Sequence, residues 1–327
     1  MSARIVTLVV GAVLLITLPF WMPGVYYLNV ASQILFYAVF AIGLNILAGY
    51  GGLVSLGHAA LFGIAAYATG YLLQHGFGHP AAILIALVVA MASTALYAVL
   101  SLRASGIGYI MITLALGEIV WGLAYRWISV TGGDNGISVH VRPEPFGIAL
   151  TSASAFYYTC LIVFALSTAM IAIFVRSPLG AALKGTRDQP RRMNALGYHV
   201  WAIRFWASML SGLLTAIAGI LFVYYNQFIS PQTLALTASA EVVLMVIAGG
   251  ASTLFGPVVG AALVVIVKSV VSGYLTRWNF LLGAIFVAIV ILMPEGLVPG
   301  TVRLWKLGWR KTIARRPKIF KAGGPPA

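Results

Sequence analysis

Long apolar runs follow one another along most of this 327-residue chain. A helix rises about 1.5 Å per residue, so about 20 apolar residues cross the hydrocarbon core of a bilayer. The alternation of apolar and polar residues that is typical of membrane β-barrel strands is absent from the sequence. The pattern therefore predicts an all-α fold, a polytopic transmembrane helical bundle of about 10 spans. The predicted spans are residues 5–22, 29–48, 53–74, 81–102, 107–127, 156–175, 204–225, 235–250, 255–275 and 280–298.

Two predicted connections are long enough to carry a function of their own. Residues 128–155 contain TGGDNG, whose glycines and Asp-Asn pair supply the positive-φ positions of tight turns. Residues 176–203 contain two short helix-compatible pieces, which Pro190 and Gly197 interrupt. The second connection is either a solvated basic linker or a docking element for a cytoplasmic partner, and both interpretations remain open.

The segment GGLVSLGHAALFGIAAYATG, residues 51–70, is apolar but rich in glycine. Its first glycines break the chain between the second and third predicted spans. By contrast, Gly57, Gly63 and Gly70, with their neighbouring alanines, predict a helix that is small on nearly every face. Because small residues let backbones approach closely, we expect this helix at the centre of the bundle or beside a cavity.

Composition supports a membrane protein. Hydrophobic residues make up 61% of the chain and charged residues only 8%, which is more apolar surface than a soluble core of this size can bury. The net charge of +14 could indicate nucleic acid, but the basic residues cluster in the segments that flank apolar spans. We therefore expect no nucleic-acid partner.

The distribution of Lys and Arg predicts the orientation. With the N-terminus inside, the inner loops hold eight basic residues from Arg4 to Arg204, and the tail holds eight more. The outer side holds only Arg126, Arg142 and Arg277, while Lys268 lies inside the ninth span. This asymmetry predicts that both termini are cytoplasmic, which also favours an even number of spans.

The sequence predicts two parts, a transmembrane domain that includes both long connections and a basic tail. Residues 1–300 form a transmembrane domain, and its signal-peptide-like start lacks an A-x-A cleavage pattern, so that start is predicted to be an uncleaved first span. Residues 301–327 form a basic cytoplasmic tail in which Trp305 and Trp309 alternate with cations. Such a pattern is typical of an interfacial helix on anionic membrane lipid.

Motifs for catalysis are missing from the sequence. It contains no G-x-x-x-x-G-K-[ST], HExxH or GxSxG, and its single cysteine, Cys160, makes no CxxC pair. Only six carboxylates exist, and only Glu118 falls in the middle of a predicted span. This scarcity argues against an enzyme and against a carrier driven by an acidic proton relay, and no cofactor or metal is expected.

Four polar side chains lie in or beside predicted spans. Each is a candidate either for lining a pathway through the bundle or for a contact between helices. Glu118 would pair with Lys268 or a helix terminus, or would line the pathway, because a charge at the bilayer centre faces protein or water. Glu241 begins an apolar run near the outer interface, where a carboxylate that packs against a helix or caps it costs little free energy. Asn45 and His58 flank the second inner loop, where each can hydrogen-bond between helices.

Ordered motifs along the chain resemble a known family. The matching segments are GYGGLVSLGHAALFGIAAYATG, ITLALGEI, TGGDNG, RSPLGAALKGTRDQPRRMNALGY, EVVLMVIAGGASTLFGPVVGA and PEGL. Over roughly residues 30–300 the chain resembles the permeases of branched-chain amino acid type ABC transporters, in their LivM-like second subunit. The resemblance implies a subunit in the bacterial inner (cytoplasmic) membrane that translocates branched-chain amino acids, or similar small amino acid or amide solutes. ATP would be hydrolysed by partner subunits.

The resemblance also implies partners and site residues. The partners are a related permease chain in a heterodimer, two cytoplasmic ATP-binding subunits and a periplasmic solute-binding protein. Residues 187–197 match the segment that couples to the ATPase, although Gln189 and Arg192 stand where acidic residues are common. A sugar-type ABC permease and a secondary carrier are the alternatives. The implied coupling residues are Arg187, Asp188, Ala195, Leu196 and Gly197, and the candidates for outer docking are Gly132, Gly133, Asp134, Asn135 and Gly136.

Overall fold

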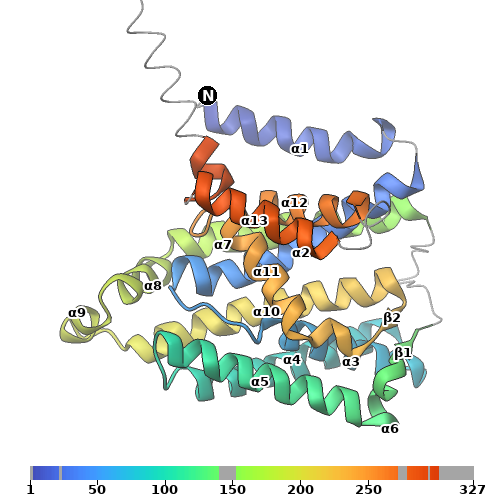
Figure 1. The fold of residues 1–327 in the computed structure, drawn as a ribbon, viewed down its shortest axis with the longest axis horizontal. Helices are drawn as coiled ribbons and strands as arrows, with labels where there is room; N and C mark the ends of the chain where they lie inside the picture. The colour runs from blue at the N-terminus through green and yellow to red at the C-terminus, as the bar shows by residue number, and fades with distance from the viewer. Residues whose placement is uncertain (1–2, 22–23, 140–151, 272–277, 294, 302–327) are drawn as a thin grey trace, which may run out of the picture.

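A computed structural model describes residues 3–21, 24–139, 152–271, 278–293 and 295–301 (Figure 1). The predicted tail therefore lies outside the described residues, apart from residue 301. Residues 140–151 of the predicted outer connection and the outer cation Arg277 lie outside them as well.

A helix occupies each of the ten predicted apolar runs in the described part of the chain, so the all-α class is confirmed. Five of these helices are long and apolar enough to cross a bilayer, namely α2 with its last turn, α4, α5, α7 and α10. The ten helices are α1 (Ala3–Trp21), α2 (Val25–Asn45), α3 (His58–Gln74), α4 (His79–Ser101), α5 (Ile107–Arg126), α7 (Ala153–Arg176), α10 (Val200–Asn226), α11 (Leu236–Gly249), α12 (Gly256–Val271) and α13 (Trp278–Leu292).

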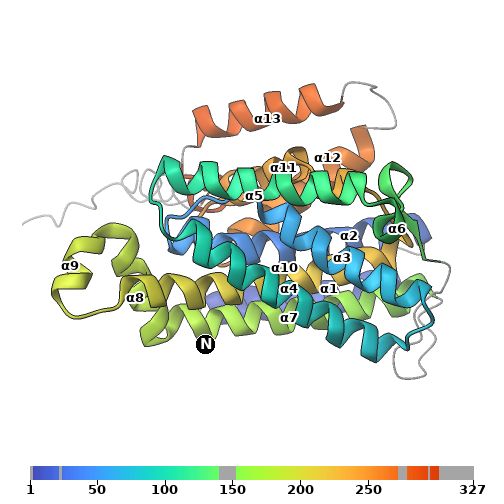
Figure 2. The same ribbon diagram turned by 90° about the horizontal axis from the view of Figure 1, so that it is seen from below.

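Shorter elements mark the two ends of the bundle. The helices α8 (Pro178–Asp188) and α9 (Pro190–Ala195) project from one end, which we call the basic end (Figures 1 and 2). The strands β1 (Ile137–Ser138) and β2 (Phe228–Ile229) pair antiparallel at the opposite end, which we call the sheet end. The N-terminus, marked in Figure 1, lies at the basic end. The remaining short elements are the π-turn η1 (Ile46–Tyr50), α6 (Ile128–Thr131), and the 3-10 turns η2 (Gly133–Asn135) and η4 (Pro231–Leu234).

The core of the bundle is formed by α2, α3 and α10. In the most apolar 18-residue stretch of each helix, 72% of α2 (taken with η1) and 67% of α10 is buried, compared with 22% of α5. Small residues permit this packing: a Cβ on Gly63 would meet Leu234, and one on Gly219 would meet the carbonyl oxygen of Phe62. The predicted central position of the small-residue helix α3 is confirmed.

The start of α3 differs from the prediction. The third span was expected from residue 53, but α3 begins at His58, and residues 51–57 are not helical. The backbone amide of Leu56 donates to Thr113 Oγ1 on α5 at 3.3 Å, and a Cβ on Gly57 would meet the Thr113 carbonyl oxygen. Gly57 is therefore a close-approach residue that precedes the helix, and its assignment to the helix was wrong.

The short eighth span is also explained by the fold. Since α11 has 14 residues, it is about 21 Å long, less than the roughly 30 Å thickness of the hydrocarbon core. Before it, the chain turns back at the sheet end through β2 and η4, where Leu234 packs against α3. The helix therefore begins inside the bundle.

Candidate functional site

The projection at the basic end follows from local sequence. The Ser177 hydroxyl accepts from the Gly180 amide at 3.2 Å, and Pro178 occupies the first turn, so α8 has a strong N-terminal cap. Pro190 starts the next helix, and Gly197 ends it with φ of 85°, a conformation that favours glycine. The two predicted breaks are thus confirmed.

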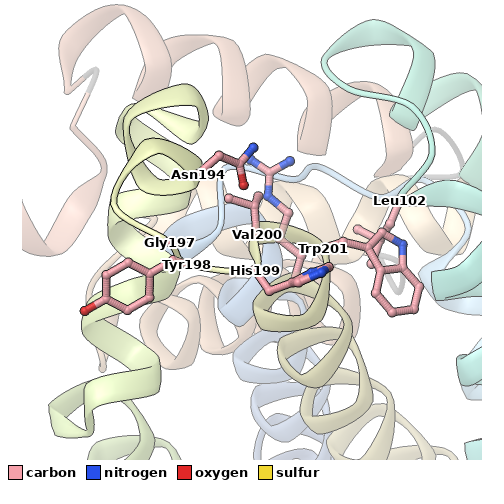
Figure 3. A pocket seen from close by; sticks show the side chains of 8 residues that line it. Leu102, Asn194, Gly197, Tyr198, His199, Val200 and Trp201 are labelled. Atoms are coloured by element: carbon pink, nitrogen blue, oxygen red, sulfur yellow. The ribbon is translucent and has the colours of Figure 1, made fainter.

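The end of this projection exposes apolar side chains. We call residues 194–199 the tip; all six are exposed, with Leu196 at 65% and Tyr198 at 50%. A cavity of about 530 Å³ lies between the tip, the start of α10 and Leu102 (Figure 3). Figure 3 shows Tyr198 pointing away from the other labelled side chains. Of the coupling residues implied by the resemblance, Ala195, Leu196 and Gly197 lie in this tip, whereas Asp188 is exposed at the end of α8.

Arg187 points instead toward the bundle. Its Nη1 donates to the carbonyl oxygen of Gly49 and to Ser252 Oγ, both at 2.6 Å. The Ser252 amide donates to Asn45 Oδ1 at 3.1 Å, and Asn45 Nδ2 donates to the Thr253 carbonyl at 2.9 Å. These five residues, which we call the Arg187 clamp, join α8 to the last turn of α2 and to the connection between α11 and α12.

His58 joins three central helices. Its Nε2 lies 2.9 Å from Ser211 Oγ on α10, and the Ser211 hydroxyl donates to the Gly43 carbonyl of α2 at 2.6 Å. Because the Ser211 hydroxyl donates its single hydrogen to the Gly43 carbonyl, it accepts from His58, and His58 Nε2 is the donor. Ser211 lies 11 residues into α10, roughly 16 Å from its start, so His58 lies deeper in the bundle than the expected cytoplasmic end of the span.

Replacing His58 with leucine should lower the free energy of unfolding by about 0.6–1.7 kcal/mol, the range found for hydrogen bonds between membrane helices. The variant removes the donor to Ser211 and replaces the imidazole with an apolar side chain of similar size. Thermal unfolding of the purified protein measures the change, with His58→Asn as the control that keeps a donor. If solute preference changed while stability did not, this helix-joining role would be wrong.

The membrane carboxylates are not arranged as expected. Lys268 Nζ on α12, one of the partners considered for Glu118, lies 3.3 Å from Glu241 Oε2 on α11 and pairs with that carboxylate. The reason is that α12 packs against α11 and α2. Glu241 lies beyond the first turn of α11 and therefore does not cap it. Glu118 is exposed in the middle of α5.

A second cavity, of about 850 Å³, lies beside the Glu241–Lys268 pair. Its lining combines this pair and several polar side chains with aromatic rings from α2, α3 and α10. Asn45, His58 and Glu118 are not among the residues that line it. Of the four polar candidates, the structure therefore brings Glu241 to this cavity.

The TGGDNG segment forms a fixed turn at the sheet end. Gly132, Gly133 and Gly136 have φ of 70°, 61° and 68°, which confirms the predicted positive φ at the glycines. The prediction was wrong for Asp134 and Asn135, which do not have positive φ. The Thr131 hydroxyl donates to the Ala124 carbonyl at 2.6 Å, and a Cβ on Gly136 would meet the Ile229 carbonyl oxygen. The side chains of Asp134 and Asn135 are exposed beside this turn.

Several residues of these sites were missed from the sequence. Ser252 and Ser211 are small hydroxyl residues within or beside apolar runs, and nothing in their spacing distinguishes them from other serines. A signal for the Glu241–Lys268 pair does exist, since opposite charges stand in the predicted spans eight and nine, which are neighbours in the chain. Consecutive helices commonly pack together, so the nearer carboxylate was the better partner.

The amino-acid sequence is similar to those of known membrane permeases. The sequence model of one family, described as "Branched-chain amino acid transport system / permease component", matches residues 26–290. The high-affinity branched-chain amino acid transport system permease protein LivM of Escherichia coli is 29% identical over 298 residues, which cover 84% of this chain and 70% of that relative. The LivM protein of Salmonella typhimurium is 28% identical over the same shares of the two chains.

A second kind of relative is also similar. The autoinducer 2 import system permease protein LsrC of Yersinia pestis is 28% identical over 254 residues, which cover 73% of this chain and 68% of that relative. No solved structure matches the chain.

Proposed function

Because this chain belongs to the family of permease components of branched-chain amino acid transport systems, we propose that it imports branched-chain amino acids or similar small amino acid or amide solutes. ATP is hydrolysed by partner subunits. The observation that carries the proposal is the α8–α9 projection, whose apolar tip is exposed while its Arg187 is tied into the bundle. This geometry suits an element that receives force outside the membrane and delivers it to the spans.

The proposed topology has ten spans, with both termini on the cytoplasmic side of a bacterial inner membrane. Four cations of α8 and α9 support it, because Lys184, Arg187, Arg191 and Arg192 gather at the end that also holds the N-terminus. Residues 1–300 would form the permease domain, and residues 301–327 would bind anionic lipid on the same side.

The tip is the proposed contact with the ATP-binding subunits. Exposed apolar side chains such as Leu196 and Tyr198 contribute most to binding when a partner cleft buries them. The helix α8 would then move with the ATPase. Because the Arg187 clamp joins α8 to α2 and to the α11–α12 connection, that movement would shift these helices between inward-open and outward-open arrangements.

The proposed partner permease packs against α5. Glu118 is exposed halfway along this apolar helix, and a charge facing lipid at the bilayer centre costs about 2.5–3.5 kcal/mol on insertion scales. A second permease chain, or the pathway between the two chains, removes that cost. On the outer side, the rigid TGGDNG turn with exposed Asp134 and Asn135 is the proposed dock for the solute-binding protein.

The ATPase contact can be tested at Gly197. We expect Gly197→Val to reduce co-isolation of the ATP-binding subunits about fivefold or more, because a β-branched residue at φ of 85° costs about 1–3 kcal/mol and distorts the tip. No atom lies within 4 Å of the added Cβ, so the membrane bundle itself should remain intact. Quantitative mass spectrometry of the affinity-purified complex measures the ratio.

Gly197→Asn is the matched control, since asparagine tolerates the left-handed region better than valine does. It should keep most of the co-isolated ATPase. Normal co-isolation with Gly197→Val would contradict the proposed contact, and absence of any ATPase from the wild-type preparation would contradict the proposed function.

A second candidate function is import of a neutral, sugar-like solute. The observation that favours it is the similarity to LsrC, an autoinducer 2 import system permease protein, over 73% of this chain. The two candidates share architecture and partners, and they differ in the solute.

A further inference from the structure

The cavity beside the Glu241–Lys268 pair reaches the sheet end of the bundle. Its volume of about 850 Å³ falls within the 300–1,000 Å³ typical of small-molecule sites. The lining includes Asn226 at the end of α10 and Gln232 of η4, both close to β2 in the chain. A small solute arriving at this end would therefore meet this cavity before the deeper part of the bundle.

One wall of the cavity carries an ion pair. Lys268 Nζ lies 3.3 Å and 3.5 Å from the two carboxylate oxygens of Glu241, and 42% and 23% of these side chains remain exposed. Both charged groups line the cavity while only partly buried, so a ligand in the cavity can reach them. Gln33, which donates to the Tyr225 hydroxyl at 2.7 Å, lines the same cavity.

Another part of the lining is aromatic. Phe36, Phe40, Phe62 and Phe222 form it, and we call them the aromatic wall. The rings of Phe40 and Phe62 stack at 4.6 Å, and Phe222 meets Phe62 edge to face at 5.3 Å. Because these contacts hold the rings in place, the wall is a preformed apolar surface.

We propose that this cavity binds the zwitterion of an apolar α-amino acid during transport. The Glu241 carboxylate accepts from the ligand ammonium, the Lys268 ammonium donates to the ligand carboxylate, and the aromatic wall contacts the aliphatic side chain. This inference rests on the proposed function, and it assigns the solute-recognition residues within this chain.

The charge arrangement selects the ligand class. The ion pair and a zwitterion are each neutral overall, so both charges of the pair find partners when the ligand inserts. A ligand with only a carboxylate or only an ammonium leaves one partly desolvated charge of the pair without a partner, which is unfavourable. A neutral sugar-like ligand gains nothing from separating the pair, so the site favours the amino acid over the alternative solute.

The test measures competition with radiolabelled L-leucine on the detergent-purified transporter complex. The competitors are leucine, 4-methylpentanoate, which lacks the ammonium, and 3-methylbutylamine, which lacks the carboxylate. In the wild type, leucine should compete best. Glu241→Gln should lower the preference for leucine over 4-methylpentanoate about tenfold or more, and Lys268→Met should lower the preference for leucine over 3-methylbutylamine by a similar factor.

A purely structural role would weaken all three ligands equally, so unchanged preference ratios would overturn the proposal. His75→Gln, an exposed position just after α3 that does not line the cavity, is the matched control and should keep both ratios. If a single variant fails to assemble, Glu241→Gln/Lys268→Met removes both charges together. That variant should bind uncharged 4-methylpentanamide as well as or better than leucine, and retained preference for leucine would overturn the proposal.

Failure of this inference differs from failure of the proposed function. If the wild-type complex accumulates leucine with ATP while the preference ratios of the variants stay unchanged, only the assignment of this cavity is wrong. If the wild-type complex neither binds nor accumulates leucine, the proposed function itself is wrong.

Discussion

Replacing Gly219 with leucine should remove most of the folded protein from the membrane. A Cβ at this position would meet the carbonyl oxygen of Phe62 and lie 3.4 Å from the Ala65 Cβ, where α10 crosses α3 at the centre of the bundle. Backbone atoms cannot move aside as a flexible side chain can. Overpacking of this kind costs about 3 kcal/mol or more, a large share of the stability of an average domain.

The measurement is the amount of monodisperse protein that size-exclusion chromatography recovers from detergent-solubilised membranes. Gly11→Leu is the matched control, because no atom lies within 4 Å of a Cβ added to Gly11 on α1. We expect the control to be recovered like the wild type. Equal recovery of Gly219→Leu would mean that α3 and α10 do not pack as closely as the structure has them.

Replacing Arg187 with alanine should uncouple ATP hydrolysis from transport. The variant removes the donor to Gly49 and Ser252, so α8 loses its polar link to α2 and to the α11–α12 connection. The tip is unchanged in this variant, so we expect it to keep its proposed contact with the ATPase. We expect the ratio of solute transported to ATP hydrolysed to fall about fivefold or more, the lower range of coupling energies between sites.

Parallel assays of ATP hydrolysis and solute uptake in proteoliposomes measure this ratio. Arg187→Lys, which keeps one cationic donor, should retain an intermediate ratio. An equal loss of both activities in the alanine variant would indicate that Arg187 serves docking or folding. An unchanged ratio would exclude the clamp from coupling.

Much of the fold could be predicted from the sequence because it depends on local properties. Each apolar run predicts a helix by its own length and hydropathy, and Pro190 and Gly197 interrupt helices by their own backbone preferences. The beginning of α3 could not be predicted this way. His58 begins the helix because Gly57 packs against the backbone of α5, a contact between residues far apart in the chain.

The candidate site was predicted less completely, because polar partners are selected by helix packing. Leu196 and Gly197 of the motif lie in an exposed projection, and their coupling role stays a prediction. The motif also grouped Arg187 with them, although the Arg187 side chain faces the bundle. Lys268 was considered as a partner for Glu118, but the packing of α11 against α12 gives it Glu241. Hydropathy predicts which residues lie inside the membrane, but it does not predict which neighbouring helix a charged side chain contacts.

We propose that this chain is the permease of an ATP-driven importer of apolar amino acids. Uptake of radiolabelled L-leucine can be measured in proteoliposomes that contain the chain with its co-isolated subunits and its solute-binding protein. We expect accumulation that requires ATP and the binding protein, and that unlabelled leucine suppresses. Accumulation driven by an ion gradient without ATP, or no leucine uptake by a complex that imports a neutral solute, would contradict it.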